Sequence, residues 1–247
     1  MDVRQALTDA GRLVLPVECA GCGRWDLVLC ARCVRLLSRP PVRCEQRAPL
    51  LGGAGTSPLP TWSVGQYRGS LRAIVLAWKT GRRQDIAPEV LTAAEQAATT
   101  WAHDPDLRSL LTDHDSVLVV PVPSGWRRRV ARRLVVADLA DAVARGLAAG
   151  RHEGEVLVAD VLRRRGGSAH QAGIGARARI ANRRGTVRAR ARLPTGTAVV
   201  LVDDVVTTGA SLAASADAAE AAGGRTVAAF TLASTAGPTG AAGRLAS

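Results

Sequence analysis

The stretch VVLVDDVVTTGASL, residues 199–212, decides the fold of this chain. Its first four residues are apolar, as in a buried strand, and two carboxylates, Asp203 and Asp204, follow directly. The next residues, Thr207-Thr208-Gly209-Ala210-Ser211, are small or hydroxylated and predict a short turn that opens a helix. A strand, a turn and a helix in this order are typical of an α/β unit with a parallel sheet.

Strand and helix patterns alternate on both sides of this unit. We expect strands at 62–67, 116–120, 156–162, 199–202 and 226–232, and helices at 71–79, 87–101, 130–147, 175–184 and 210–222. The alternation predicts an α/β fold whose mostly parallel sheet carries helices on both faces. A stretch rich in Gly, Pro and Ser predicts a linker, so we expect an N-terminal segment at 1–48, the linker at 49–61, a main domain at 62–234 and a flexible tail at 235–247.

The opening stretch also predicts a binding site. Ligands of parallel sheets bind outside the carboxyl ends of the strands, where we expect Asp203 and Asp204. Backbone N–H groups at a helix start attract phosphate, and Gly209 lets the backbone approach it closely. Because carboxylates repel phosphate, a sugar between them is the economical ligand, and the acids can also recruit Mg²⁺ through water. We therefore expect a sugar 5-phosphate; the alternative is a capped strand–turn–helix with two solvated aspartates.

Two CxxC pairs, Cys19/Cys22 and Cys30/Cys33, stand near the N-terminus. Their spacing allows four thiolates to converge on one tetrahedral ion, which predicts a structural zinc ribbon or knuckle. The alternative is a disulfide or redox pair, which needs an oxidising compartment or a thioredoxin-like context. Cys44 is left over. The chain contains no apolar run of the ~18–20 residues that a membrane span needs, and its N-terminus makes a poor signal peptide. We expect a cytoplasmic protein.

Basic residues outnumber acidic ones by 33 to 21, which gives a formal charge of +12. This charge favours polyanions such as nucleic acid, phosphorylated metabolites or an acidic protein, although an arginine-rich composition also follows from a GC-rich genome. Aromatic residues make up only 3% of the chain, too few for a base-stacking surface. Nucleic-acid binding is therefore expected to be weak and electrostatic. Lys79, the single lysine, ends an expected helix, where the helix dipole explains it as well as a ligand does.

The stretch Asp203–Ser211 resembles the loop that binds phosphoribosyl pyrophosphate (PRPP) in type I phosphoribosyltransferases. The rest of the chain is similar to the ComF family over about residues 17–234, through the paired cysteines and the motifs at 67–71, 76–79, 119–123, 162–165, 170–171, 179 and 182. In that family a zinc-ribbon segment precedes a phosphoribosyltransferase-like domain. Its members are linked to DNA uptake in competent bacteria.

The resemblance implies that Asp203, Asp204 and residues 207–211 bind PRPP or another phosphorylated ribose, with Mg²⁺, beside a structural zinc. It places the pyrophosphate near four residues: Pro121, Pro123, Arg127 and Arg132. An active protein would transfer the phosphoribosyl group to a nitrogen acceptor. The alternative is a non-catalytic accessory protein of DNA uptake that binds a protein partner or single-stranded DNA.

The chain departs from the family pattern in two places. Arg132-Arg133-Leu134-Val135-Val136 replaces the family's Arg-Gly-Phe-Asn-Gln, so the glycine, the aromatic residue and both amides of the pyrophosphate half are missing. This departure favours the non-catalytic alternative. The family also often carries a second cysteine pair, whereas Cys44 stands alone here.

Overall fold

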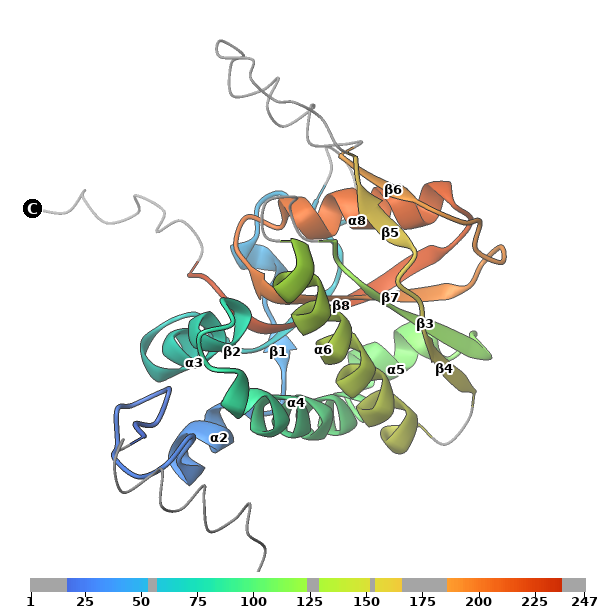
Figure 1. The fold of residues 1–247 in the computed structure, drawn as a ribbon. Coiled ribbons are helices and arrows are strands. Elements are labelled where there is room, and N and C mark those ends of the chain that lie inside the picture. Colours follow the sequence, from blue (N-terminus) through green and yellow to red (C-terminus); the bar gives the residue numbers. More distant parts are fainter. Residues whose placement is uncertain (1–16, 53–56, 124–128, 152–153, 166–185, 237–247) are drawn as a thin grey trace, which may run out of the picture.

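Figure 1 shows the computed structural model of the chain, in which a twisted sheet separates two layers of helices and loops. The structure describes residues 17–52, 57–123, 129–151, 154–165 and 186–236, without the side chains of 129–134. Its elements are α2 (Ala31–Leu37), β1 (Val42–Arg43), η1 (Glu45–Arg47), β2 (Thr61–Gln66), α3 (Gly69–Lys79), η2 (Gln84–Ile86), α4 (Ala87–Trp101), α5 (Pro105–Leu111), β3 (Ser116–Pro121), α6 (Arg129–Gly150), β4 (Glu155–Val158), β5 (Leu162–Arg164), β6 (Val187–Ala189), β7 (Ala198–Val206), α8 (Ala210–Ala221) and β8 (Arg225–Ser234).

The main sheet has six strands in the order β1-β2-β8-β7-β3-β4. All neighbouring pairs are parallel except β1 with β2, so the predicted α/β fold with a mostly parallel sheet is confirmed. From β3 the chain passes through α6 to β4, toward one edge of the sheet, and from β7 it passes through α8 to β8, in the opposite direction. The direction of winding therefore reverses between β3 and β7, which is the place where open α/β sheets bind ligands.

Each face of the sheet has its own apolar core, because neighbouring side chains of a strand point to opposite faces. On β7, Val200 and Val202 belong to the core that α3, α4 and α6 cover, and Val199 and Leu201 belong to the core beneath α8. The first core contains an aromatic cluster in which the rings of Trp62 and Trp101 have centroids 5.4 Å apart. The expectation that helices cover both faces is confirmed, and Figure 1 shows the two layers.

The N-terminal segment packs directly on this architecture. Cys33 and Leu37 are buried in the same core as Trp62, and Val42 of β1 pairs with Ser63 of β2. The predicted domain boundaries at 48, 61 and 234 stay predictions. Described residues of this segment nevertheless belong to the two cores of the sheet, Cys33 and Leu37 to the first and Cys44 to the one beneath α8, and this burial stabilises their position.

Two sequence expectations were wrong in detail. The strand expected at 156–162 is two strands: β4 stays beside β3, whereas β5 leaves the main sheet and pairs with β6. The break follows from a turn in which Val161 N–H donates to the Ala159 carbonyl at 2.9 Å. The strand expected at 199–202 continues to Val206, because β8 accompanies it to the pair Val206/Ser234. The basic helix expected at 175–184 lies outside the described residues.

Candidate functional site

The sheet opens at the carboxyl end of β3. The last register pair of β3 with β7 is Pro121 with Val202, and Val122 N–H still donates to the Val202 carbonyl at 2.9 Å. Beyond this point β7 continues on β8 alone. Asp203 and Asp204 therefore stand where one neighbouring strand has ended, although they lie inside β7 and not after it.

A glycine with a left-handed backbone joins the turn after β7 to α8. Gly209 has a φ of +82°, in the left-handed region that side chains rarely adopt, and it precedes the first residue of α8. Among the described residues no side chain caps this helix, so its first N–H groups are oriented toward the space in front of the turn. Leu50 N–H donates to the Thr208 carbonyl at 2.8 Å and holds the turn from behind.

Gly209 also makes room for a neighbour that the sequence analysis missed. A Cβ atom at this position would lie 2.5 Å from Leu51 Cγ and 3.1 Å from the Leu51 backbone nitrogen. Residues 50 and 51 thus form the rear wall of the turn. They come from the stretch that the sequence analysis assigned to a linker.

In front of the turn lies a cavity of about 360 Å³. It is lined by all five predicted residues of the turn and by Asp203, together with Arg164, Thr186, Val205, Val206 and Leu212. Its volume is within the range of roughly 300–1,000 Å³ that small-molecule sites span. The structure therefore brings the predicted phosphate loop and one of the two predicted carboxylates to the same space.

The two aspartates differ in their surroundings. Asp203 lines the cavity, and its Oδ1 accepts a hydrogen bond from the Asp204 N–H at 2.8 Å. Asp204 is buried, and its Oδ2 lies 3.2 Å from Lys79 Nζ, with both side chains 12% exposed. Lys79 Nζ also lies 5.9 Å from the centre of the Tyr67 ring. The helix end of α3 thus supplies a cation to the second carboxylate, which the sequence analysis had left undecided.

A second cavity of about 270 Å³ adjoins the first and shares Asp203 and Thr207 with it. Its other lining residues include Tyr67, Lys79, Asp204, Val122 and Pro123. Of the residues assigned to pyrophosphate, Pro123 lines this cavity and Pro121 is the buried last residue of β3. Arg127 lies outside the described residues, as does the side chain of Arg132.

The four cysteines of the CxxC pairs form a second candidate site. The Sγ atoms of Cys19, Cys22, Cys30 and Cys33 all lie within 4.8 Å of one another, and those of Cys22 and Cys30 are 3.6 Å apart. At Zn–S distances of about 2.3 Å, tetrahedral ligands are separated by roughly 3.8 Å, so this cluster can hold one zinc ion. All five cysteines are described, and all are free thiols. Cys44 is buried in the core on the α8 side and does not belong to the cluster.

The protein environment favours ionised sulfur at part of this cluster. Burial opposes ionisation of Cys19, but hydrogen bonds from the backbone N–H groups of Cys30, Cys22 and Gly21 outweigh it and lower the Cys19 pKa to about 6. A hydrogen bond from the Cys33 backbone lowers the pKa of Cys30. Burial raises the pKa of Cys33. Turns whose N–H groups are directed at sulfur are what a metal-binding thiolate requires.

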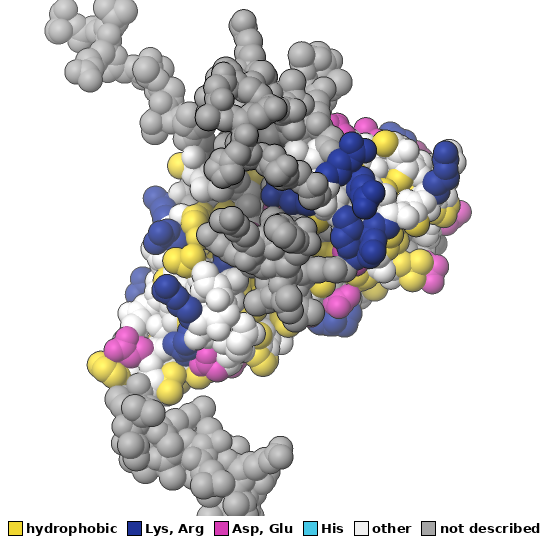
Figure 2. All heavy atoms as spheres, turned by 45° about the horizontal axis from the view of Figure 1, so that its top comes forward, with side chains coloured by type: hydrophobic (Ala, Val, Ile, Leu, Met, Phe, Trp, Pro, Cys, Tyr) yellow, Lys and Arg dark blue, Asp and Glu magenta, His cyan; other side chains and the backbone are white. Residues whose placement is uncertain are grey.

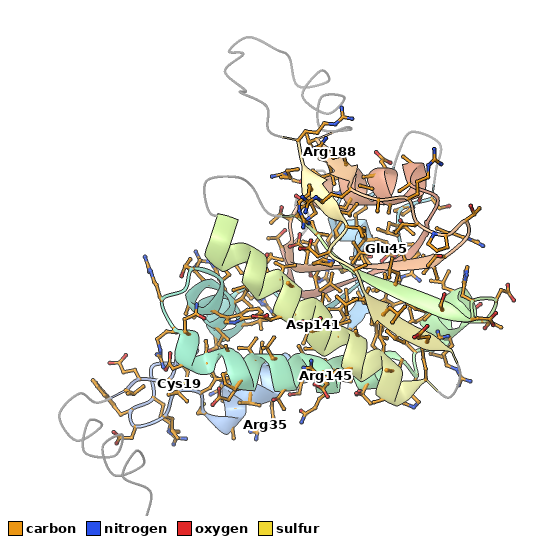
Figure 3. The ribbon with its side chains drawn as sticks, turned by 45° about the vertical axis from the view of Figure 1, so that its right-hand side comes forward. Cys19, Arg35, Glu45, Asp141, Arg145 and Arg188 are labelled. Carbon is orange, nitrogen blue, oxygen red and sulfur yellow. The ribbon has the colours of Figure 1, made fainter. Side chains whose placement is uncertain are left out.

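Arg83, which lies outside the cluster, forms hydrogen bonds with the loops that carry the cysteines. Arg83, just after α3, donates to the Glu18 carbonyl at 2.8 Å and to the Val28 carbonyl at 3.4 Å. Its guanidinium also holds Asp85, with Nη2 2.7 Å from Oδ2, and this contact lowers the pKa of Asp85. Figure 3 shows Cys19 beside α2, at the opposite end of the molecule from Arg188 on β6. No described cysteine lines either cavity beside the 207–211 turn, so the cysteine cluster and these cavities are separate sites.

Sequence reasoning missed part of the cavity. Arg164 and Thr186 line it from β5 and from the residue before β6, and both strands leave the main sheet. No local pattern indicated that β5 and β6 would lie beside the turn at 207–211. The run Leu162–Arg165 was noted for its family resemblance, which was the available signal for Arg164.

The chain matches no protein-family model and no curated protein. Within the described residues, no helix combines the length and the apolar character that crossing a membrane requires.

Proposed function

We propose that the chain binds a phosphorylated ribose, PRPP or ribose 5-phosphate, at the turn between β7 and α8, as a phosphoribosyltransferase-like protein of the ComF type. One observation carries the proposal: the turn at 207–211 and the carboxylate of Asp203 line one cavity of about 360 Å³. The backbone N–H groups of the turn suit a phosphate, and the carboxylate of Asp203 suits sugar hydroxyls. A ligand that contains both fits better than an inorganic anion.

In this proposal the 5-phosphate binds the backbone N–H groups of residues 207–211 and the hydroxyls of Thr207, Thr208 and Ser211. The N-terminal end of the α8 dipole and the guanidinium of Arg164 add positive charge on the same side. Asp203 accepts hydrogen bonds from the ribose hydroxyls. The sugar separates this carboxylate from the phosphate and so removes their repulsion.

The adjoining cavity would take the pyrophosphate of PRPP. Lys79 supplies a cation there, beside Asp204, and Pro123 forms part of the wall. Mg²⁺, when bound with PRPP, would neutralise the diphosphate charge. The acidic oxygens of Asp203 and Asp204 fit the preference of Mg²⁺ for oxygen ligands reached directly or through water.

For an active protein, the reaction is substitution at ribose C1. The C1–O bond to pyrophosphate breaks, the C1–N bond to a nitrogen acceptor forms, and the acceptor proton leaves to solvent or base. Positive charge develops on the ribose ring, as in glycoside cleavage. The carboxylate of Asp203 stabilises that charge electrostatically.

Titration calorimetry with PRPP and ribose 5-phosphate, with and without Mg²⁺, tests the proposal. Asp203→Asn keeps the size of the side chain but removes the charge, so the affinity should fall about tenfold for each charge-assisted hydrogen bond lost. Asp113→Asn, an exposed position outside both cavities, makes the same charge change and should leave affinity unaltered. Absence of binding by the wild type at millimolar ligand with Mg²⁺ would overturn the proposal.

Zinc at the four-cysteine cluster belongs to the same proposal. So does a cytoplasmic location, where reducing conditions keep thiols available to the metal. We also propose, as a second candidate function, a non-catalytic accessory role in DNA uptake with a protein partner or single-stranded DNA. The exposed arginines on and after β6 support it, because they lie outside the candidate ribose site. Release of pyrophosphate from PRPP in the presence of candidate amines separates the two functions.

A further inference from the structure

A third hollow, the arginine groove, runs between β6 and α8 and has a volume of about 530 Å³. Its floor consists of alanines of α8 and the residue after it, and its wall carries the side chains of Arg165, Arg188, Arg190 and Arg192. Figure 2 shows Lys and Arg side chains gathered on this part of the surface, at the upper right. The groove shares no lining residue with the cavity in front of the 207–211 turn.

The arginines of the groove alternate with alanines on β6 and on the residues after it. Arg188, Arg190 and Arg192 stand at every second position, and all three are exposed. Alternate residues of a strand are about 6.6–6.8 Å apart; β6 ends at Ala189 and a bend follows at residues 190 and 191, so Arg192 lies beyond the strand. An extended partner with an acidic residue at every second position has the same repeat. Figure 3 shows the side chain of Arg188 directed away from the main sheet.

The backbone of β6 presents a strand edge to the same groove. Arg190 N–H donates to the Val161 carbonyl at 2.8 Å, and the Thr186 carbonyl accepts from Arg165 N–H at 2.7 Å. Even-numbered positions therefore direct their backbone groups toward β5. Val187 and Ala189 direct theirs to the opposite edge, and both line the groove. No strand in the described part of the chain covers that edge.

We propose that the arginine groove binds an extended acidic peptide segment of a partner protein, which adds to the edge of β6 as a further strand. Its backbone would form hydrogen bonds with Val187 and Ala189, and its carboxylates would pair with the arginines. Its small side chains would lie on the alanine floor. This partner chemistry is independent of ribose binding at the other cavity.

The observations favour a peptide over nucleic acid as the occupant. None of the residues that line the groove is aromatic, so nucleobases would have no stacking surface. An open strand edge offers both N–H and C=O groups, which a peptide backbone satisfies and a phosphate backbone satisfies only in part.

Fluorescence anisotropy with a labelled peptide of alternating glutamate and alanine, about ten residues or roughly 33 Å long, tests the proposal. A second peptide has the same sequence with its alanine nitrogens methylated, which keeps the charges and removes backbone donors. An oligothymidylate of equal length reports on nucleic acid. The double variant Arg188→Glu/Arg190→Glu is compared with Arg35→Glu/Arg39→Glu, which changes the net charge equally at two exposed positions on and after α2.

We expect the wild type to bind the unmodified peptide at about 0.1 M salt, where long-range charge effects are screened. Reversal at Arg188 and Arg190 should weaken this binding at least about tenfold, and the control variant should not. Methylation should weaken it several-fold. Equal binding of both peptides, equal losses in both variants, or no peptide binding by a wild type with native melting behaviour would each overturn the proposal. Tighter binding of oligothymidylate that depends on Arg188 and Arg190 would assign the groove to nucleic acid instead.

Discussion

Substitution of Gly209 by alanine probes the rear wall of the candidate phosphate turn. The glycine has a φ of +82°, and a Cβ atom there would lie 2.5 Å from Leu51 Cγ. Two separate costs follow. The left-handed backbone disfavours a side chain by roughly 1–2 kcal/mol, and forcing a methyl group into occupied space costs roughly 1–3 kcal/mol. We expect Gly209→Ala to lower the free energy of unfolding by roughly 2–5 kcal/mol.

Gly196 provides a matched control for the first cost. Its φ is +81°, and an added Cβ would have no heavy atom within 4 Å. Gly196→Ala should therefore cost only the backbone contribution, roughly 1–2 kcal/mol. The difference between the two variants isolates the contact with Leu51. Combining Gly209→Ala with Leu51→Ala should recover that difference as a coupling energy of about 1–3 kcal/mol.

Urea unfolding at neutral pH, followed by tryptophan fluorescence, measures these three variants and the single variant Leu51→Ala. The midpoint should shift without a change in slope, because the surface exposed on unfolding is the same. Equal losses in Gly209→Ala and Gly196→Ala, with no coupling to Leu51, would show that residues 50 and 51 do not form a wall behind the turn. Ribose 5-phosphate affinity should fall in Gly209→Ala and remain unchanged in Gly196→Ala.

Three further predictions concern other parts of the molecule. Purified protein should contain one equivalent of zinc by mass spectrometry. Cys22→Ser should lose the zinc, because Cys22 belongs to the four-cysteine cluster, whereas Cys44→Ser should keep it, because Cys44 does not. Burial, followed by the charge of Glu45, raises the pKa of Cys44 from 9.0 to about 11. Between pH 9 and pH 11 the thiol ionises in the unfolded chain but stays neutral in the folded one. Roughly 2–3 kcal/mol of stability, present below pH 9, should therefore be lost as the pH rises to 11. Urea titrations of Cys44→Ala should lack that loss. Lys79→Met should destabilise the protein by about 1–3 kcal/mol, because it leaves the Asp204 side chain without the partner 3.2 Å away, and a double-mutant cycle with Asp204→Asn should show a positive coupling energy.

Short-range patterns predicted most of the fold. The apolar period placed the helix at 87–101 with the bounds that the structure has, and the strands expected at 62–67, 116–120, 199–202 and 226–232 overlap β2, β3, β7 and β8. The short edge strand β1 was not expected. The end of β7 could not be predicted, because it depends on how far β8 accompanies it, which is a tertiary fact. The departure of β5 from the sheet depends in the same way on its partner β6, whose first residue, Val187, comes 25 residues after Leu162, the first residue of β5.

The candidate site was predictable where its residues are consecutive. Asp203 and the residues 207–211 come from one stretch, so local geometry alone brings them together. Lys79, Arg164 and Leu51 come from three distant segments, and only the packed structure shows that they meet this stretch. A single lysine at a helix end carries no local sign of its partner, and the pairing with Asp204 depends on how α3 lies against the sheet.

The contact of residues 50 and 51 with the turn has a consequence for deletion experiments. A shortened chain that begins after residue 52 removes the cysteine cluster, but it also removes the hydrogen bond to Thr208 and the side chain that packs behind Gly209. Loss of ribose binding in such a chain would therefore say nothing about zinc. Separating the two sites genetically requires point substitutions at the cysteines, with the rear wall of the turn left in place.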